Sequence, residues 1–477
     1  MNNRSFLYRI CFSALLSLSI QSSNSFAQNL PPVTTWEGNL MGMRFILKVN
    51  QDSTTKETIA TFDSPDQGAF GFPVSKLLIT NDSLLAYSSI LKADFNGKFT
   101  SSKLQLAGKW KQSGKEYELI FKRVPNEKIP GRPQTPKAPF PYSEEKIIYF
   151  NNDKTIQYGA TLTIPPLVKN APIVILITGS GQVDRDETVY GHKPFWVIAD
   201  NLSRNGIAVL RVDDRGVGES TGDVSYATSA DFAKDVLVGV EYLKSRKDLH
   251  FGKIGLIGHS EGGIIGPIAA NQSKDISFII SLAGVGIKGS DLMRKQYKDL
   301  NALRGFDKSE EERANSFTDM MIELATSDRD GNSLKVAFHN SISKWLKEQP
   351  DSFLVKMNLK GTTGDDIINK TIVTFSFPWM RYLMKYDPAL VLSKIQIPFL
   401  ALNGGKDVQV YAKENLDGFD KYLSQAGNKD YKTILLPNLN HFFQNAKTGK
   451  LHEYPIIEET ISPEVLDIIT KWILKRQ

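Results

Sequence analysis

The chain has 477 residues, which is more than one average domain and predicts at least two. Its hydrophobic content of 41% and charged content of 23% are ordinary values for a globular protein. The formal net charge of +6 is too small for a chain of this length to indicate nucleic-acid binding, so no nucleic-acid partner is expected.

Residues 1–27 have the features of a secretory signal peptide. Arg4 and Arg9 are followed by the apolar run Ile10–Ile20, and the sequence then reaches Ser25-Phe26-Ala27, a small-x-small spacing that signal peptidases cleave. Because the apolar run is too short to span a bilayer, we expect cleavage near Ala27 and no stable membrane anchor. The mature protein is therefore predicted to be exported, to the periplasm or the medium.

The only cysteine, Cys11, lies inside the predicted signal peptide. The mature chain therefore has no thiol for a disulfide or for a cysteine metal site. No cluster of other metal-ligating residues stands out, and the sequence predicts neither a metal nor any other cofactor.

Residues 28–124 are predicted to form a small all-β domain. Short runs alternate apolar and polar residues between Gly, Asn, Asp and Ser, which is typical of strands and hairpins. The runs are Met43–Val49, Glu57–Phe62, Lys76–Thr80, Leu84–Ser88, Lys103–Leu106 and Glu116–Phe121. Trp36 and Trp110 lie towards the two ends of this region, and we expect them to pack at one end of a sandwich or barrel. Residues 125–141 hold six prolines and are predicted to form an extended linker.

Beyond the linker, apolar runs alternate with helical segments, which indicates a parallel sheet with helices on both faces. The predicted strands are 173–177, 207–212, 254–257, 278–283, 398–402 and 433–436, and the predicted helices are 195–202, 231–243 and 463–475. From 287 to 392 the pattern is helical and polar. Residues 142–286 and 393–477 are therefore predicted to form one α/β domain, interrupted by a helical insertion at 287–392.

The segment Lys253–Ile265 is predicted to form a strand, a Gly-x-Ser-x-Gly turn and a helix. Gly258 and Gly262 permit a tight turn that lifts the Ser260 hydroxyl above the sheet edge, at the positive end of the following helix. The five-residue motif alone occurs by chance in many chains, but the strand before it and the helix after it favour a nucleophile. Ser260 is therefore the predicted catalytic nucleophile.

A serine nucleophile needs a histidine base, and in sheets of this type the base follows the serine along the chain. Of the six histidines, only His441 and His452 lie beyond both Ser260 and the helical insertion. His441 follows a predicted strand through a short loop, whereas His452 lies in a polar stretch and is expected to be exposed. His441 is therefore the predicted base.

The base needs an acid that orients its ring, and the acid is expected between the serine and the histidine. Asp407 follows the predicted strand 398–402 through a short glycine-containing loop, so its carboxylate should leave the sheet at the same edge. Its competitor, Asp387, precedes that strand and is expected to cap a helix. Asp407 is the predicted acid.

An oxyanion hole needs two backbone N–H groups directed at the developing alkoxide. One is predicted at Glu261, directly after the nucleophile. The second is predicted at Ser180 or Gly181, in the loop Thr178–Gln182 that leaves the first central strand. A phosphate-binding role for this Gly-Ser-Gly is not favoured, because the Lys-Ser/Thr of a P-loop is missing.

These residues occur together in a pattern typical of one superfamily: Gly179-Ser180-Gly181 with Asp184-Arg185-Asp186, the turn Asp213–Ser220, Gly258–Gly262, Asp407 and His441. In this pattern the chain resembles the α/β-hydrolases from about residue 145 to its end, and within them the exported bacterial esterases and the serine aminopeptidase-like branch. The resemblance implies an α/β-hydrolase fold with a helical cap and acyl transfer to water through a serine ester. The His-Gly-Gly-Gly loop of lipases is absent, which argues against long lipid substrates.

The sequence therefore predicts a serine carboxylesterase that acts on small or medium acyl esters. Phe375, Phe377 and Trp379 of the insertion could line an acyl pocket or simply pack the cap. Two alternatives stay open: a serine aminopeptidase or amidase, for which Glu310–Glu312 could hold an ammonium group, and a non-catalytic protein that binds a glycan or envelope component. The natural substrate and the oligomeric state are not predicted.

Overall fold

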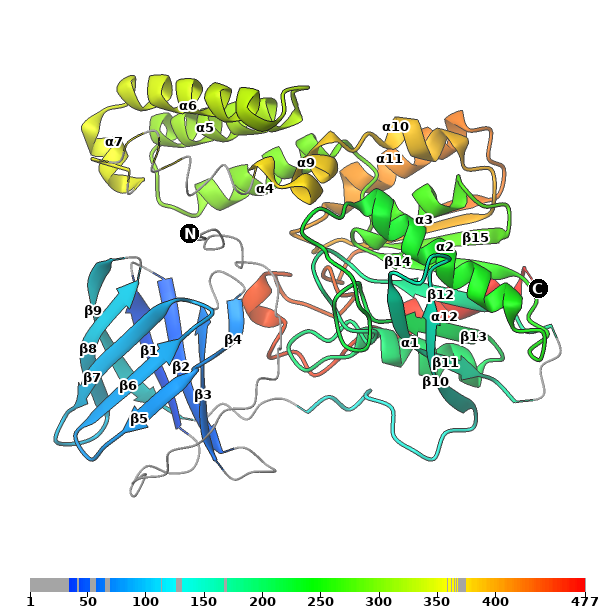
Figure 1. Ribbon diagram of the computed structural model, residues 1–477, viewed down its shortest axis with the longest axis horizontal. Coiled ribbons are helices and arrows are strands. Elements are labelled where there is room, and N and C mark those ends of the chain that lie inside the picture. Colours follow the sequence, from blue (N-terminus) through cyan, green and yellow to red (C-terminus); the bar gives the residue numbers. More distant parts are fainter. Residues whose placement is uncertain are drawn as a thin grey trace. The chain divides into compact units, whose positions relative to one another are not determined.

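The computed structural model describes residues 34–40, 43–51, 57–64, 69–112, 114–125, 131–166, 170–357, 359–361, 363, 365, 367 and 375–476 (Figure 1). The predicted signal peptide, with Cys11, lies outside these residues, so export stays a prediction from the sequence. The chain divides into two compact units. The smaller unit holds the described residues up to Gly131 together with Leu451–Glu458, and the larger holds Arg132–Lys450 and Glu459–Gln477.

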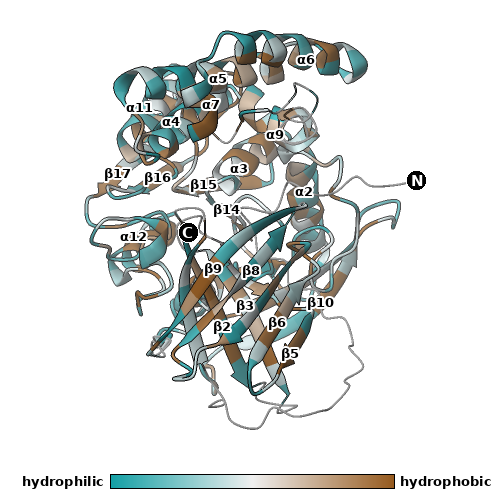
Figure 2. Cartoon of the chain, turned by 90° about the vertical axis from the view of Figure 1, so that its left-hand side faces the viewer, coloured by the Kyte–Doolittle hydropathy of each residue, from teal (hydrophilic) through white to brown (hydrophobic). Residues whose placement is uncertain are grey.

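The smaller unit is a nine-stranded antiparallel sheet with the strand order β4-β3-β2-β1-β9-β8-β7-β6-β5. Its strands alternate hydrophobic and hydrophilic residues along their length, as Figure 2 shows, so one face is buried and the other is exposed. Their bounds are β1 Thr34–Leu40, β2 Met43–Gln51, β3 Thr58–Ser64, β4 Ala69–Pro73, β5 Lys76–Ile79, β6 Ser83–Ser88, β7 Ala93–Phe99, β8 Gln105–Gln112 and β9 Lys115–Val124. Three of these strands, β1, β4 and β7, are not among the predicted runs.

This sheet curls around its own aromatic core. The ring of Trp110 on β8 lies 4.8 Å from that of Phe45 on β2 and 5.0 Å from that of Phe62 on β3. Neighbouring strands are about 4.8 Å apart, so strands three and four places away in the sheet touch only if the sheet bends back on itself. Trp36 is buried in the same cluster, but its ring partner is Phe99, 5.6 Å away. The two tryptophans are thus both core residues with different ring partners.

The last part of the predicted linker is fixed to the larger unit. Gln134 donates its amide N–H to the carbonyl of Ile461 at 2.8 Å, and its amide oxygen accepts the backbone N–H of Ile461 at 3.1 Å. Arg132 donates to the carbonyl of Tyr190 at 2.9 Å. Proline cannot donate a backbone hydrogen bond, so the side chains between the prolines hold this segment in place.

The larger unit has an eight-stranded sheet with the order β10-β11-β13-β12-β14-β15-β16-β17. The pairs β10·β11 and β11·β13 are antiparallel, and every later neighbour pair is parallel. The bounds are β10 Ser143–Phe150, β11 Gln157–Ile164, β12 Ile173–Ile177, β13 Ala208–Val212, β14 Ile254–His259, β15 Ile276–Leu282, β16 Phe399–Gly404 and β17 Tyr431–Leu436. The hairpin β10·β11 was not predicted.

Helices cover both faces of this sheet. Along β12, Ile173, Ile175 and Ile177 point into one buried cluster and Val174 and Leu176 into another, so both faces are apolar. The first cluster includes residues of α2 (Ser229–Ser245), α3 (Gly262–Ala270) and α11 (Ala412–Gln425). The second includes residues of α1 (Pro194–Arg204) and α12 (Pro463–Leu474).

A helical cap is inserted between β15 and β16. Its elements are α4 Gly289–Ala302, α5 Lys308–Thr326, α6 Gly331–Lys347, α7 Asp351–Lys356, α9 Pro378–Lys385, α10 Pro388–Val391 and the short helix η2 Leu392–Lys394. The cap has a core of its own, which includes Met321, Phe338 and Phe375. Asp387 caps α10 by accepting the N–H of Ala389 at 3.0 Å, as predicted.

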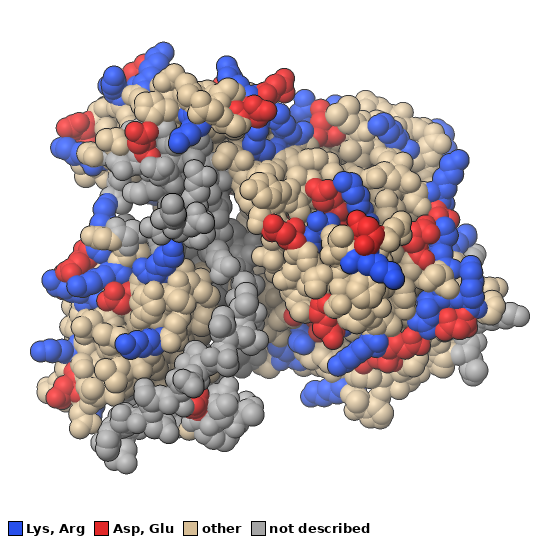
Figure 3. Space-filling model, in the orientation of Figure 1, with Lys and Arg blue, Asp and Glu red and all other residues tan. Residues whose placement is uncertain are grey.

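Charged side chains are mixed on the surface. On the face drawn in Figure 3, Lys and Arg are interspersed with Asp and Glu over the described residues, and no continuous surface of one sign is present there. Within the described part of the chain, no helix has the length and apolar character that crossing a bilayer requires.

The start of α3 packs very closely against the sheet. A Cβ at Gly262 would lie 2.3 Å from the carbonyl oxygen of Ile177, whereas one at Gly266, a turn later, would meet its nearest neighbour at 3.7 Å. We therefore expect Gly262→Ala to force α3 off β12 at a cost of about 1–3 kcal/mol. Thermal unfolding should show a lower transition temperature for Gly262→Ala and an unchanged or slightly higher one for Gly266→Ala. Equal effects of the two substitutions would contradict this packing.

Candidate active site

Ser260 occupies a strained turn at the end of the central strand β14. Its φ is +53°, a left-handed conformation that residues with a side chain rarely adopt, and Glu261 follows as the N-cap of α3. A Cβ at Gly258 would lie 2.1 Å from the carbonyl oxygen of Gly262, so the chain reverses too closely for a larger residue. The turn holds the Ser260 hydroxyl at the N-terminus of α3, where the helix dipole favours negative charge.

His441 and Asp407 form a buried hydrogen bond. The Nδ1 atom of His441 lies 2.7 Å from Oδ2 of Asp407, and both side chains are almost completely buried. The other carboxylate oxygen of Asp407 accepts the backbone N–H groups of Gln409 and Val410, each at 2.8 Å. With Nδ1 donating to a fixed carboxylate, the Nε2 atom of His441 is left as a proton acceptor.

The turn with Ser260 and the loop with His441 meet through His259. The rings of His259 and His441 are 4.8 Å apart, and Nε2 of His259 is 3.1 Å from the carbonyl oxygen of His441. Ser260 Oγ makes no hydrogen bond to any described residue. Catalytic hydrogen bonds commonly tighten only when a substrate is bound.

Unused backbone donors lie close to Ser260. A Cβ at Gly179 would be 3.2 Å from Cβ of Ser260, so the loop after β12 lies directly against the turn. Among the described residues, the N–H groups of Ser180, Gly181 and Glu261 have no hydrogen-bond acceptor. These are the three residues predicted to supply the oxyanion hole.

The side chain of Glu261 contacts the cap. Its carboxylate accepts the hydroxyl of Ser229 at 2.6 Å and the indole N–H of Trp379 at 2.8 Å. Burial raises the pKa of Glu261, and the hydrogen bonds from Ser229, Trp379 and Ser180 oppose that rise. Trp379, on α9, is therefore attached to the residue next to Ser260. Phe377 is the half-buried N-cap of the same helix.

Phe375 lies elsewhere. It is 4% exposed, belongs to the core of the cap and stacks on Tyr297 at 5.9 Å. Of the three aromatic residues predicted for an acyl pocket, Phe375 is thus a packing residue, because its ring is covered by neighbouring cap helices.

Comparison with known proteins identifies the family. The model of the α/β-hydrolase fold family matches residues 171–445, more than half of the chain. The chain belongs to this family. The sheet order, the cap between β15 and β16 and the preceding all-β region agree with the fold class expected from the sequence.

The chain is also similar to esterase EstD of Thermotoga maritima, at 26% identity over 398 residues, 82% of this chain and 83% of that protein. A match of that length includes part of the first 131 residues as well as the α/β-hydrolase unit. Among solved structures, an esterase of Pyrococcus furiosus covers 74% of this chain and 99% of its own, with 13% identity and a TM-score of 0.41. Est1E of Butyrivibrio proteoclasticus covers 69% and 98%, with 17% identity and a TM-score of 0.39.

Three acidic or basic residues near the α/β-hydrolase site were not predicted to act there: Glu187, His259 and Asp214. Glu187 Oε1 accepts the backbone N–H of Gly179 at 2.9 Å and lies 2.7 Å from Nδ1 of His259. The charged run Asp184–Glu187 follows the loop Thr178–Gln182 in the chain, but the sequence does not identify the partner of Glu187. Within the described residues, no group of three or more His, Cys, Asp or Glu side chains could hold a metal ion.

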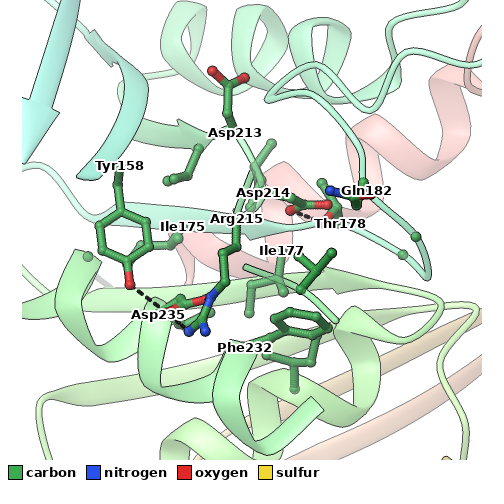
Figure 4. A pocket seen from close by; sticks show the side chains of 18 of the residues that line it. Tyr158, Ile175, Ile177, Thr178, Gln182, Asp213, Asp214, Arg215, Phe232 and Asp235 are labelled. Carbon is green, nitrogen blue, oxygen red and sulfur yellow. Dashed lines mark hydrogen bonds and ion pairs between the residues drawn. The ribbon is translucent and has the colours of Figure 1, made fainter. Parts of the chain in front are cut away.

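Asp214 supports the loop Thr178–Gln182, the predicted oxyanion loop, from a small cavity behind it. The carboxyl accepts the hydroxyl of Thr178 at 2.6 Å (Figure 4). It also accepts the N–H of Val183 at 2.9 Å. The cavity has a volume of about 70 Å³ and is lined on its other side by Tyr158, Arg215 and Asp235, where Asp235 accepts hydrogen bonds from both Tyr158 and Arg215. It has room for a few water molecules.

Burial raises the pKa of Asp214 well above its usual value, because Thr178 and Val183 only partly oppose the loss of solvent and Glu187 and Glu261 lie nearby. In the unfolded chain this carboxyl ionises near pH 4. Stability is therefore lost as the pH rises from that value through the raised pKa of the folded state, at up to about 1.4 kcal/mol per pH unit.

We expect Asp214→Asn to remove this loss, since its amide can donate to Thr178 and accept from Val183. The difference in transition temperature between Asp214→Asn and the wild type should therefore increase, in favour of the variant, from pH 5 to pH 8. The matched control is Asp213→Asn, because Arg185 and backbone donors lower the pKa of Asp213 and its charge stabilises the fold. That variant should lose stability at pH 8. An equal loss by both variants would show that Asp214 is ionised.

Proposed function

We propose that the protein is a serine carboxylesterase that cleaves small or medium acyl esters through an acyl-enzyme. Ser260 is the nucleophile, His441 the general base and Asp407 the residue that orients the imidazole. The main support is the buried hydrogen bond between Asp407 and His441, 2.7 Å long, on loops that leave the same edge of the parallel sheet as the Ser260 turn. The similarity to an esterase over 82% of the chain adds to this support.

The proposed reaction has two matching halves. Ser260 Oγ attacks the ester carbonyl while its proton moves to Nε2 of His441, and the alkoxide forms near the N–H groups of Glu261 and of Ser180 or Gly181. His441 then returns the proton to the leaving alcohol, which leaves the acyl group on Ser260. Water attacks this ester with His441 again as base, releases the acid and restores the serine.

An ester substrate is favoured over a peptide with a free amino terminus. An aminopeptidase would need an available carboxylate for the substrate ammonium group, and Glu310–Glu312 were the candidates for it. Glu310 instead accepts the N–H of Asp307 at 3.0 Å at the start of α5 and pairs with Lys356 at 2.7 Å. The carboxylate of Glu310 is therefore already engaged at the N-terminus of α5 and with Lys356.

We expect Ser260→Ala to lower kcat for a p-nitrophenyl acyl ester by about 10⁴-fold or more, since the variant has no nucleophile. A fluorophosphonate probe should label the wild type and leave the variant unlabelled. Ser245→Ala, an exposed serine at the end of α2, is the control and should retain full activity and labelling.

Two results would overturn the proposal. Unchanged ester cleavage by Ser260→Ala would exclude the nucleophile, and a wild type that neither hydrolyses esters nor reacts with the probe would favour the non-catalytic binding protein. Faster cleavage of an aminoacyl nitroanilide than of the acyl ester would favour the aminopeptidase.

Trp379 and Phe377 are proposed to line the acyl pocket, because α9 reaches Glu261 next to the nucleophile. Trp379→Phe removes the indole donor from a buried carboxylate, and we expect kcat/KM to fall by roughly 5–30-fold. The preferred chain length in a series from acetate to octanoate should also change. Trp345→Phe is the matched control, because its indole N–H donates to Ser316 at 3.2 Å inside the cap. An equal effect of both substitutions would indicate general loosening of the cap.

A further inference from the structure

His259 links two loops that the proposed reaction requires. Its Nδ1 atom lies 2.7 Å from Oε1 of Glu187, and the same oxygen accepts the N–H of Gly179 in the oxyanion loop. Its Nε2 atom lies 3.1 Å from the carbonyl oxygen of His441. The oxyanion loop, the nucleophile turn and the loop with the base are thus joined by one imidazole ring.

The two partners of the ring determine its charge. A backbone carbonyl oxygen can only accept a hydrogen bond, so Nε2 of His259 has to carry a proton in order to bond to it. A carboxylate oxygen is likewise an acceptor, so Nδ1 carries a proton as well. A ring that donates from both nitrogens is an imidazolium, and here its charge is balanced by Glu187.

The surroundings of His259 favour this charged form. The side chain is 5% exposed, and the ring of Phe442 lies 5.0 Å from the imidazole. Burial lowers the pKa of His259, but Glu187, the carbonyl of His441 and the charge of Asp407 outweigh burial, so the pKa lies above its usual value. The titratable groups around the ring are therefore Glu187 from the loop after β12, Asp407 after β16 and His441 after β17.

We propose that Glu187 and His259 form a buried charged bridge that positions the oxyanion loop and the His441 loop, and that loss of this bridge limits activity on the alkaline side. This inference rests on the proposed function. Glu187 and His259 are positioning residues, since they contact the backbone of Gly179 and His441 and not the substrate. When His259 loses a proton, Nε2 presents a lone pair to the carbonyl of His441, and the hydrogen bond becomes a repulsive contact.

The sign of the pH dependence follows from the direction of the shift. The folded-state pKa of His259 is raised, so the bridge is complete below the pKa of the unfolded state and is lost as the pH rises through the folded value. The alkaline limb of kcat/KM should therefore follow the deprotonation of His259.

The test is the pH profile of kcat/KM for a p-nitrophenyl ester in Glu187→Gln. The amide can still accept the N–H of Gly179, but it provides no negative charge, and burial then lowers the pKa of His259. We expect the alkaline limb to move to lower pH by about one unit or more, with at least a tenfold loss at pH 8 and a smaller loss near pH 6. In His259→Gln this limb should be absent.

The matched control is His192→Gln. His192 is also buried in the same unit, but its ring bonds to the neutral side chains of Thr460 and Gln444. Its substitution should leave the alkaline limb at the wild-type pH. A limb that keeps its position in Glu187→Gln and His259→Gln, or that moves equally in His192→Gln, would overturn the proposal.

A second measurement is independent of catalysis. The chain has six histidines, so the NMR spectrum of Ser260→Ala labelled with ¹⁵N-histidine contains few ring signals. The signals that disappear when His259→Gln is added to this variant belong to His259. Two protonated nitrogens near pH 7 are expected for His259, with loss of one proton at higher pH. A neutral ring at pH 7 would overturn the bridge even if the esterase function holds. If instead no ester is cleaved by the wild type, the proposed function fails while the charge of His259 remains measurable.

Discussion

The site depends on how closely the backbone of α3 approaches the sheet. Gly262 has no side chain, and a Cβ at this position would lie only 2.3 Å from the carbonyl oxygen of Ile177. Gly258 allows the tight reversal of the chain before the helix. Directly before this contact, Ser260 has a left-handed conformation and Glu261 is the N-cap of α3. Because β12, β14, β16 and β17 are parallel, the loops after them open at the same edge, which brings the Thr178–Gln182 loop, Ser260, Asp407 and His441 together.

Buried acids surround the oxyanion loop on several sides. Asp214 holds Thr178 and Val183, Glu187 holds Gly179, and Glu261 accepts Ser229 and Trp379. Three carboxyls in a poorly solvated region repel one another, so the arrangement requires that they differ in charge. The raised pKa of Asp214 favours its neutral form, and Glu187 is paired with His259. Holding the loop by a buried carboxyl with a raised pKa therefore costs stability at neutral and alkaline pH.

Much of the fold could be predicted from the sequence because the central strands are continuous apolar runs. Ile173–Ile177 and Ile254–Ile257 are buried on both faces, and the glycines around Ser260 mark the turn. The first hairpin, β10·β11, was missed because its exposed edge strand carries charged residues such as Glu144 and Glu145. Asp407 and His441 were predicted from chain order and from their positions just after predicted strands. Phe375 could not be assigned, since the side of a cap helix that faces the core depends on packing between helices that the sequence does not specify.

The pair Glu187 and His259 illustrates a further limit. The two residues are 72 positions apart and lie on different loops, so neither predicts the other. His259 belongs to the nucleophile motif, where the serine accounts for the pattern and the histidine beside it has no evident task. The structure gives that position a specific requirement: a side chain that donates hydrogen bonds from both ends, one to a carboxylate and one to a carbonyl. Among the uncharged side chains none has two rigid donors at opposite ends of a planar ring, so the imidazolium meets this requirement with no conformational adjustment.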